Sequence, residues 1–223
     1  MLQKLTPELA AAAALTATQI AMAVEQLADE KVPAEVKADF LIAFAKKGET
    51  PDEIAAFAAA LREKSIAPPL DAETRAGEIL DVVGTGGDRL GTINISTTAA
   101  LICAAAGVTV AKHGNRAVTS QAGSADVLDA LGIRIDLSPA EAARSLSEKN
   151  FAFFFAPNFH PAFKHIAPAR RLCAERGRRT IFHLLGPLLN PARPSAMLVG
   201  VPRSDICEPL ANVLQSLDRK SVV

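Results

Sequence analysis

The pattern of apolar and polar positions divides the chain into two parts with different rhythms. Up to about residue 66 the chain predicts helices only, and proline and capping residues mark where they begin. Thr6 followed by Pro7 is an N-cap with proline at the first helical position, and Thr50-Pro51-Asp52-Glu53 adds a capping-box glutamate. The predicted helices in this part cover residues 6 to about 28, 33–48 and 50 to about 64.

After residues 67–69, which read Ala-Pro-Pro, the pattern changes to short strands, polar loops and helices. This alternation predicts right-handed crossovers and a mainly parallel sheet. The predicted strands cover residues 79–83, 108–111, 133–135, 151–155, 196–201 and 221–223, and the predicted helices cover residues 97–106, 124–131, 138–148, 161–175 and 204–217. We therefore expect an α/β fold with a small N-terminal helical domain at residues 1–70 and a larger α/β domain at residues 71–223.

Composition and charge argue against several classes of protein. The 223 residues include 24 basic and 24 acidic side chains, so net charge favours neither a nucleic-acid nor a membrane-surface partner. No apolar run has membrane-spanning length, and the first residues do not resemble a signal peptide. The three cysteines are scattered and odd in number, which favours a reducing compartment. We expect a cytoplasmic protein without nucleic-acid or membrane partners.

Four polar motifs predict a site that wraps a phosphorylated ligand. Glycines allow the backbone to approach phosphate oxygens, while hydroxyls and free N–H groups at a helix start donate to them. Lys112 and Arg116 add positive charge, and Asp88 implies a cation or a ribose hydroxyl between its carboxylate and the anion. The motifs are Gly84-Thr-Gly-Gly-Asp88, Asn94-Ile-Ser-Thr97, Lys112-His-Gly-Asn-Arg116 and Gly123-Ser-Ala-Asp126. The first and third follow predicted strands, so both loops should lie at the carboxyl edge of the sheet.

The order and spacing of these motifs resemble those of the anthranilate phosphoribosyltransferases. Matching stretches at residues 156–170 and 180–191 extend the resemblance over essentially the whole chain. It implies transfer of the phosphoribosyl group of phosphoribosyl pyrophosphate to the amine of anthranilate, with release of diphosphate, in tryptophan biosynthesis. It also implies Mg²⁺ as the cofactor, Ser96 as a metal contact and a homodimer formed through the helical domain.

The resemblance further implies two sets of substrate-binding residues. Those implied for phosphoribosyl pyrophosphate are Gly84, Gly87, Asp88, Thr92, Asn94, Ile95, Ser96, Thr97, Lys112, His113, Gly114, Asn115, Arg116, Ala117, Val118, Thr119, Ser120 and Ser124. Those implied for anthranilate are Gly84, Asn115, His160 and Arg170. A planar guanidinium suits the anthranilate carboxylate. No catalytic acid or base is assigned, since an aromatic amine is already a neutral nucleophile.

Two alternative functions stay open at this stage. Pyrimidine nucleoside phosphorylases also have a helical domain and a glycine loop, but Val83 stands where their lysine precedes that loop. A non-catalytic relative that binds nucleic acid would need a basic face, which the balanced charge does not support.

The last residues, Arg219-Lys-Ser-Val-Val223, predict the opening of a buried strand. In the family this strand leads into a loop whose Asp-Glu pair holds a second Mg²⁺ ion, and this pair is absent here. We therefore expect a fragment or a natural truncation of a longer enzyme. Such a chain should bind metal-diphosphate weakly, catalyse slowly or not at all, and associate through an unfinished sheet edge.

Overall fold

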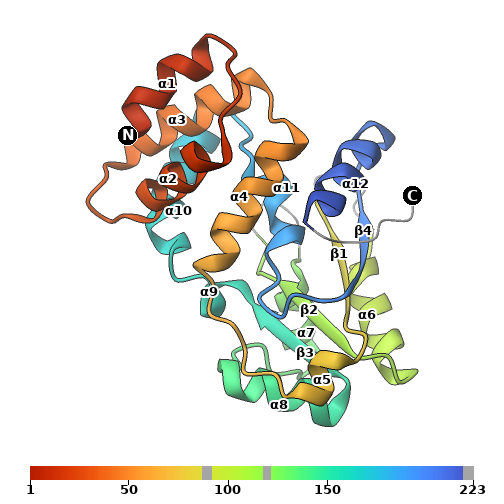
Figure 1. Ribbon diagram of the computed structural model, residues 1–223. Coiled ribbons are helices and arrows are strands. Elements are labelled where there is room, and N and C mark those ends of the chain that lie inside the picture. Colours follow the sequence, from red (N-terminus) through yellow and green to blue (C-terminus); the bar gives the residue numbers. More distant parts are fainter. Residues whose placement is uncertain (87–91, 118–121, 218–223) are drawn as a thin grey trace. The chain divides into compact units, whose positions relative to one another are not determined.

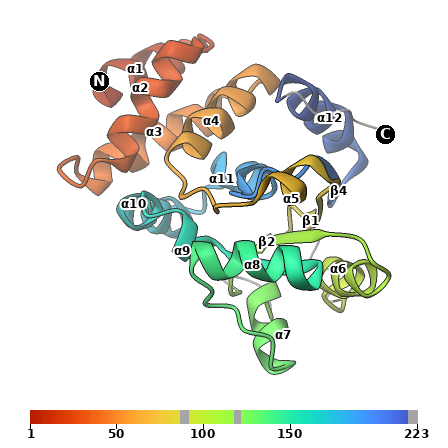
Figure 2. The same cartoon turned by 60° about the horizontal axis from the view of Figure 1, so that its bottom comes forward.

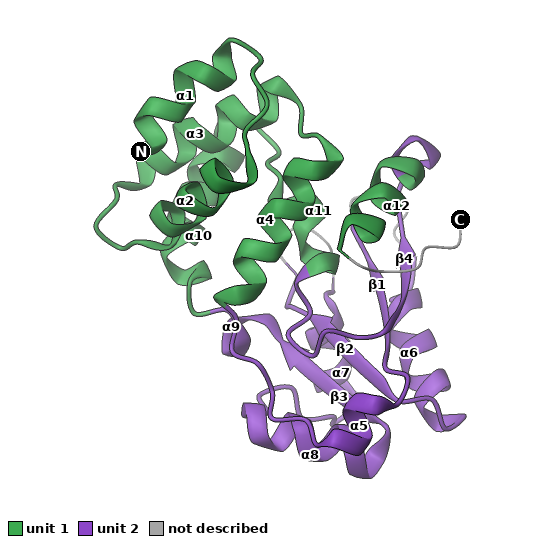
Figure 3. Ribbon diagram, in the orientation of Figure 1, with its two compact units in different colours: residues 1–64, 161–188, 207–223 green, residues 65–160, 189–206 purple. Residues whose placement is uncertain are grey.

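The computed structural model describes residues 1–86, 92–117 and 122–217 (Figure 1). These residues form two compact units (Figure 3). Unit 1 comprises residues 1–64, 161–188 and 207–223, and unit 2 comprises residues 65–160 and 189–206. The domain boundary at residue 70 stays a prediction.

Unit 1 is built of helices. They are α1 Leu2–Ala10, α2 Ala17–Ala28, α3 Ala34–Lys47, α4 Pro51–Glu63, α10 Phe163–Glu175, α11 Phe182–Leu185 and α12 Cys207–Ser216. Helix α3 packs against α1 and α10, and α4 packs against α2 and α12. The second and third predicted helices are confirmed, and Thr50 and Glu53 form the predicted capping box of α4. None of the described helices is long and apolar enough to cross a membrane.

The single helix predicted over residues 6–28 is wrong. The chain forms α1 and α2 instead, with Pro7 inside α1, and Ala12 adopts a φ of 61° between them. The backbone N–H of Leu15 donates to the buried Glu53 carboxylate at 2.8 Å, and Thr16 then caps α2. This tertiary hydrogen bond overrides the high helix propensity of the alanines.

A buried lysine joins three segments of unit 1. The Lys37 side chain is 1% exposed, and its Nζ donates to the backbone oxygens of Asp29 at 2.7 Å and His165 at 2.8 Å. Asp29 is the C-cap of α2, and His165 lies in the first turn of α10. Lys37 on α3 thus connects the end of α2 and the start of α10 to α3.

Replacing Lys37 should therefore destabilise the protein. We expect Lys37→Met to lower the free energy of unfolding by about 2–4 kcal/mol, because two partly buried carbonyls lose a donor while the side-chain volume is kept. Urea denaturation followed by circular dichroism measures the change. Lys46→Met, at an exposed position of the same helix, is the matched control and should be close to neutral. Equal stability of the two variants would contradict the bridging role of Lys37.

Unit 2 contains one parallel sheet. Its strands are β1 Leu80–Gly84, β2 Val110–Gly114, β3 Phe151–Phe155 and β4 Ala196–Gly200, in the order β3-β2-β1-β4. All the pairs are parallel, which confirms the predicted sheet type. Its helices are α5 Ala72–Ala76, α6 Ile95–Ala105, α7 Ser124–Ala130, α8 Pro139–Lys149 and α9 Ala156–Phe159. Two short 3-10 turns are also present: η1 at Gly186–Leu189, which begins in unit 1 and ends in unit 2, and η2 at Ser204–Ile206 in unit 2.

Two of the predicted strands, at residues 133–135 and 221–223, are not among the strands of the described sheet. Residues 133–135 do not form a strand; Ile135 is buried beside Phe153 of β3, so these apolar residues cover one face of the sheet and do not extend it. The prediction for residues 221–223 falls outside the described residues.

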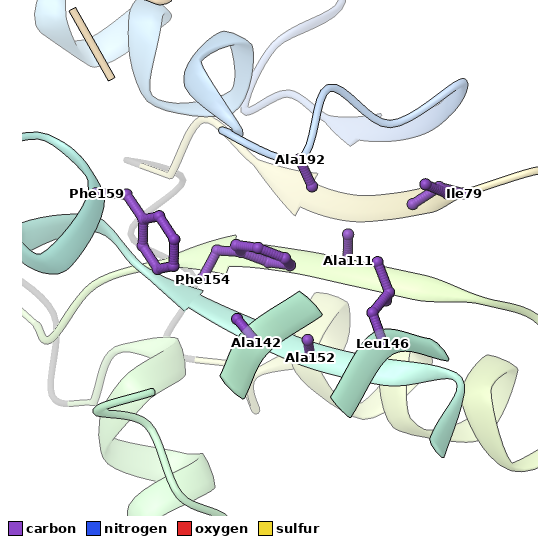
Figure 4. Packing of buried hydrophobic residues seen from close by; sticks show 8 residues of the cluster. All are labelled: Ile79, Ala111, Ala142, Leu146, Ala152, Phe154, Phe159 and Ala192. Atoms are coloured by element: carbon purple, nitrogen blue, oxygen red, sulfur yellow. The ribbon is translucent and has the colours of Figure 1, made fainter. Parts of the chain in front are cut away.

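Alternate residues of the strands are buried by different helices. Val82 and Val110 pack with Ala100 of α6 on one face of the sheet. On the other face, Ala111 and Phe154 pack with Leu146 of α8, and Figure 4 shows this cluster extending to Ile79, Phe159 and Ala192. Figure 2 shows α6 and α8 as two separate helices near β2. Because both faces are covered at β1, β2 and β3, the loops at the carboxyl ends of these strands are the exposed edge that a ligand can reach.

Candidate functional site

The first two motifs meet at the end of β1. After Gly84 the N–H of Thr85 donates to Gly200 O of β4 at 3.0 Å, so the backbone continues beside that strand. A Cβ added to Gly84 would lie 3.6 Å from Gly200 O and 3.9 Å from the Ser96 hydroxyl oxygen. The Ser96 hydroxyl therefore faces the beginning of the glycine loop.

The start of α6 is also tied to the fourth motif. The Asn94 amide Nδ2 donates to Ala122 O at 3.1 Å, directly before Gly123. Ser96 is partly exposed and Thr97 is buried at the first turn of α6. The free N–H groups of this turn are a general anion-binding feature, and here they accompany a hydroxyl that faces Gly84.

The loop after β2 is locked against the start of α7. Asn115 O accepts hydrogen bonds from the Ser124 hydroxyl at 3.3 Å and from the Ala125 N–H at 3.2 Å. A Cβ on Gly114 would collide with the Ser124 hydroxyl and lie 3.0 Å from the Phe153 ring. Glycine at position 114 therefore allows the third and fourth motifs to approach each other.

Asp126 organises the same loop. Its carboxylate accepts the N–H groups of Ala117 and Gly123, each at 2.8 Å, and these bonds together with Arg116 hold its pKa below the ordinary value. The Arg116 guanidinium also binds Asp129, at 3.0 Å from each carboxylate. Arg116 thus lies against α7, and its contact with a phosphate stays a prediction.

Lys112 and His113 are buried in β2, with exposed fractions of 2% and 6%. The Lys112 Nζ donates to Val82 O of β1 at 2.8 Å, and burial lowers the pKa of this ammonium while Asp81 raises it. The His113 Nε2 lies 3.2 Å from the Nε2 of His160, which is 3% exposed. Burial lowers the pKa of His160 to about 4, while the backbone of Leu189 acts in the opposite direction.

The expected site residues divide into three groups. Gly84, Thr92, Asn94, Ile95, Ser96, Thr97, Lys112, His113, Gly114, Asn115, Arg116, Ala117, Ser124 and His160 belong to unit 2. Gly87, Asp88, Val118, Thr119 and Ser120 lie outside the described residues. Arg170 belongs to α10 of unit 1, where its guanidinium lies 5.0 Å from the Phe182 ring centre.

Sequence reasoning assigned no individual role to three polar residues that organise this region: Asp81, Asn190 and Asp126, the last of them within the fourth motif. Asp81 and Asn190 are buried, and the Asn190 Nδ2 donates to Asp81 Oδ2 at 2.9 Å. A carboxylate inside the apolar run 79–83 was a local signal for Asp81. The position of Asp126 three residues after Gly123 was a signal for a capping carboxylate.

The donor chemistry of the described residues fits Mg²⁺ only in part. No group of three His, Cys, Asp or Glu among these residues is placed to hold a metal ion. The Ser96 hydroxyl is a hard oxygen donor beside the glycine loop, and Mg²⁺ commonly combines few protein ligands with waters and substrate phosphates. Ser96 therefore suits an ion whose other ligands come mainly from a bound phosphorylated substrate.

Comparison with protein-family models gives two matches that follow one another along the chain. Residues 2–65 match the helical bundle domain of the glycosyl transferase family, and residues 76–223 match its a/b domain. The chain belongs to this family. The a/b-domain match contains all four motifs at the carboxyl edge of the sheet.

Within this family, the chain is similar to several anthranilate phosphoribosyltransferases. It is 48% identical over 206 residues to the anthranilate phosphoribosyltransferase of Petrotoga mobilis, an alignment that covers 92% of this chain and 58% of that protein. The crystal structure of the Thermus thermophilus anthranilate phosphoribosyltransferase matches with a TM-score of 0.86 and 42% identity, covering 96% of this chain and 63% of that chain. The Saccharomyces cerevisiae anthranilate phosphoribosyltransferase, in complex with phosphoribosyl pyrophosphate and Mg, matches with a TM-score of 0.84 and 27% identity, covering 97% and 62%.

These matches confirm the resemblance and the fold class inferred from the motifs. The chain spans about three fifths of the length of the relatives that it matches.

Proposed function

We propose that this chain belongs to an anthranilate phosphoribosyltransferase of tryptophan biosynthesis, and that its two substrates are phosphoribosyl pyrophosphate and anthranilate. The observation that carries the proposal is the convergence of Gly84, Ser96 and the Asn94–Ala122 hydrogen bond at the carboxyl edge of the sheet. The similarity to a relative bound to phosphoribosyl pyrophosphate and Mg supports it. The alternative of a nucleoside phosphorylase has no comparable support.

In the proposed reaction the amine of anthranilate attacks C1 of the ribose and diphosphate leaves. Mg²⁺, when bound, supplies charge stabilisation for the diphosphate. The Ser96 hydroxyl, the first N–H groups of α6 and the glycine-loop amides bind and orient the phosphates. The buried charge of Lys112 adds positive potential beneath the loops, while its Nζ keeps β1 and β2 in place. Most of the rate enhancement then comes from positioning and electrostatic stabilisation.

The remaining site residues enter as proposals. We propose that the polar residues of the described loops, together with Gly87, Asp88, Val118, Thr119 and Ser120, surround phosphoribosyl pyrophosphate. Gly84, Asn115, His160 and Arg170 are proposed to bind anthranilate. We further propose a helical domain at residues 1–70, a homodimer formed through it, an α/β domain from residue 71 and a cytoplasmic location. No nucleic-acid partner is proposed.

Two measurements on the same sample test this function. Isothermal calorimetry should detect binding of phosphoribosyl pyrophosphate in the presence of Mg²⁺, and EDTA should weaken it. Loss of anthranilate fluorescence, with the product identified by mass spectrometry, reports turnover. Binding and turnover with uridine and phosphate, but with neither proposed substrate, would favour the nucleoside phosphorylase and overturn the proposal.

Arg170 offers a test of the anthranilate site. We expect Arg170→Ala to raise the KM for anthranilate by about 10- to 150-fold with little change for phosphoribosyl pyrophosphate, since a bidentate charge-assisted contact is worth about 1.5–3 kcal/mol. Steady-state kinetics with each substrate varied in turn measures this difference.

The neighbouring Arg171, which is exposed on the same helix, provides the control. Arg171→Ala should leave both KM values near those of the parent. If analogues without a carboxylate lose as much affinity in Arg170→Ala as anthranilate does, the carboxylate role of Arg170 is wrong.

A further inference from the structure

The sheet of unit 2 is interrupted between its two central strands. β1 pairs with β4 through all five of its residues, and β2 pairs with β3 in the same way. Between β1 and β2, however, the structure pairs only Leu80 with Val110, where the Leu80 N–H donates to Thr109 O at 2.9 Å. Two strand pairs are therefore joined near their amino ends and separate toward their carboxyl ends (Figure 1).

Beyond the Leu80–Val110 pair, hydrogen bonds from side chains take the place of the backbone hydrogen bonds expected between β1 and β2. A regular parallel continuation would pair Val82 with Lys112 and use the carbonyls of Val82 and Ala111 together with the N–H of His113. In this structure Lys112 Nζ donates to Val82 O at 2.8 Å, and Asn190 Nδ2 donates to Ala111 O at 2.7 Å. The His113 N–H interacts with the Asp81 carboxylate, where it helps to counter the rise in pKa caused by burial.

Asn190 is the link between the two strands. Its Nδ2 donates both to Asp81 Oδ2 of β1, at 2.9 Å, and to Ala111 O of β2, while its Oδ1 accepts the Ala192 N–H at 2.9 Å. Asn190 is 1% exposed and Asp81 is 0% exposed, so water cannot replace these bonds without a rearrangement. An amide is the group that can donate twice and accept once in this position.

The polar contacts close into a ring. From Asn190 the chain leads back to Leu189, whose backbone interacts with His160, and His160 contacts His113 through their Nε2 atoms. The His113 backbone then reaches Asp81, which returns to Asn190. Hydrogen bonds in such a buried network support one another, so the loss of one member affects the others.

The ring lies beneath the loops of the candidate site. Gly84 ends β1, and Gly114 ends β2 on the other side of the gap. A regular ladder up to these residues would draw the two strand ends together to the spacing of paired strands. With the inserted side chains, the strand ends at Gly84 and Gly114 are left unpaired with each other.

We propose that Asn190 is a positioning residue for phosphoribosyl pyrophosphate: together with Asp81 it holds β1 and β2 apart, so that the strand ends at Gly84 and Gly114 stand at the separation the ligand requires. This inference rests on the proposed function. Asn190 acts through the strands and does not touch the reacting atoms.

The test compares two variants at two pH values. Asn190→Asp keeps the shape of the side chain, removes both donors and places a second carboxylate beside Asp81. At about pH 8 we expect phosphoribosyl pyrophosphate to bind at least tenfold more weakly than to the parent, measured by calorimetry with Mg²⁺. At about pH 5.5 one proton shared by the two carboxyl groups restores a donor, and the ratio to the parent should shrink several-fold.

The other charged or titratable groups around the ring are the same in the parent and in Asn190→Asp. The ratio of their affinities therefore reports only the effect of the new carboxyl group. These other groups are Lys112 and His113 of β2, His160 after α9 and Arg75 of α5, which donates to Ala192 O. Asp81→Asn is the second variant. It removes the carboxylate charge and one of the two acceptor oxygens that serve Asn190 and the His113 N–H. Because the pKa of Asp81 is about 6, the loss of affinity should be larger at about pH 8, where the parent carboxylate is charged, than at about pH 5.5. Circular dichroism melting verifies that each variant is folded.

Asn158→Asp provides a matched control, because the Asn158 Nδ2 donates to Leu137 O at 3.3 Å, away from the gap between β1 and β2. It should bind the ligand as the parent does. Parent-like affinity of both test variants at both pH values would overturn the positioning role, and if Asn190→Asp does not fold, Asp81→Asn decides. Binding of uridine and phosphate by the parent, without binding of phosphoribosyl pyrophosphate, would overturn the proposed function, a result distinguishable from the first.

Discussion

Gly123→Ala should abolish the binding of phosphoribosyl pyrophosphate under conditions where the parent binds it. A Cβ at position 123 would collide with the backbone N of Ala117 and lie 2.6 Å from Arg116 C and 2.7 Å from Asn115 O. All three atoms belong to the backbone, so no side-chain rotation can make room for the methyl group. We expect a loss of affinity of about 100-fold or more and a loss of about 1–3 kcal/mol in the free energy of unfolding.

Gly77→Ala is the matched control for this prediction. Gly77 has a φ of −75°, and the nearest atom to an added Cβ is Thr74 O at 3.6 Å, an ordinary contact distance. The change should leave the free energy of unfolding within about 0.5 kcal/mol of the parent. Calorimetric titration with phosphoribosyl pyrophosphate and urea denaturation measure both variants. Parent-like binding by Gly123→Ala would show that the loop after β2 can rearrange around the added methyl group.

Asp81→Asn and His160→Gln should change the dependence of stability on pH in opposite directions. Burial raises the pKa of Asp81 from 3.8 to about 6, so between about pH 6 and pH 4 the folded chain binds a proton that the unfolded chain does not. This group therefore makes the fold more stable as the pH falls. Burial lowers the pKa of His160 from 6.5 to about 4, so over nearly the same range the unfolded chain binds the extra proton and the fold loses stability.

In the parent these two contributions partly cancel. Asp81→Asn removes the stabilisation that protonation of Asp81 provides at low pH. Relative to the parent, the free energy of unfolding of this variant should therefore fall by about 2–3 kcal/mol as the pH falls from about 6.5 to about 4. His160→Gln removes the destabilisation that the lowered pKa of His160 causes at low pH. Its free energy of unfolding, relative to the parent, should therefore rise by a similar amount over the same pH range. Urea denaturation at several pH values gives the difference from the parent at each pH. Curves parallel to that of the parent would contradict the protonation states assigned to both groups.

Local sequence signals predicted much of the fold. Helices α4 and α8 begin where they were expected, and each begins with a capping box, at Thr50 and at Ser138, whose hydrogen bonds lie within one helical turn. The predicted strand 151–155 matches β3, a run rich in phenylalanine. The break between α1 and α2 was not predictable in this way, since it depends on a hydrogen bond from Leu15 to Glu53, which lies 38 residues later.

Local sequence signals also predicted only part of the candidate site. The motifs indicated which loops gather at the sheet edge, because glycine, hydroxyl and amide residues follow predicted strands. The interruption between β1 and β2 was not indicated, since Asp81 and Asn190 are separated by 109 residues and the sequence around one does not indicate a contact with the other. The engagement of Arg116 by α7 could have been suspected from the two carboxylates that follow it at positions 126 and 129.

Unit 1 combines segments that are far apart in the sequence, and this arrangement affects how the chain folds during synthesis. Helix α3 leaves the ribosome long before α10, yet Lys37 finds its second acceptor only in His165, 128 residues later. Closing so long a loop is slow, and until then the apolar side of α3 lacks the helix that covers it. The first four helices must therefore wait in a partly exposed state while unit 2 is made. Chaperone capture during translation should accordingly be strongest before residue 175 has emerged.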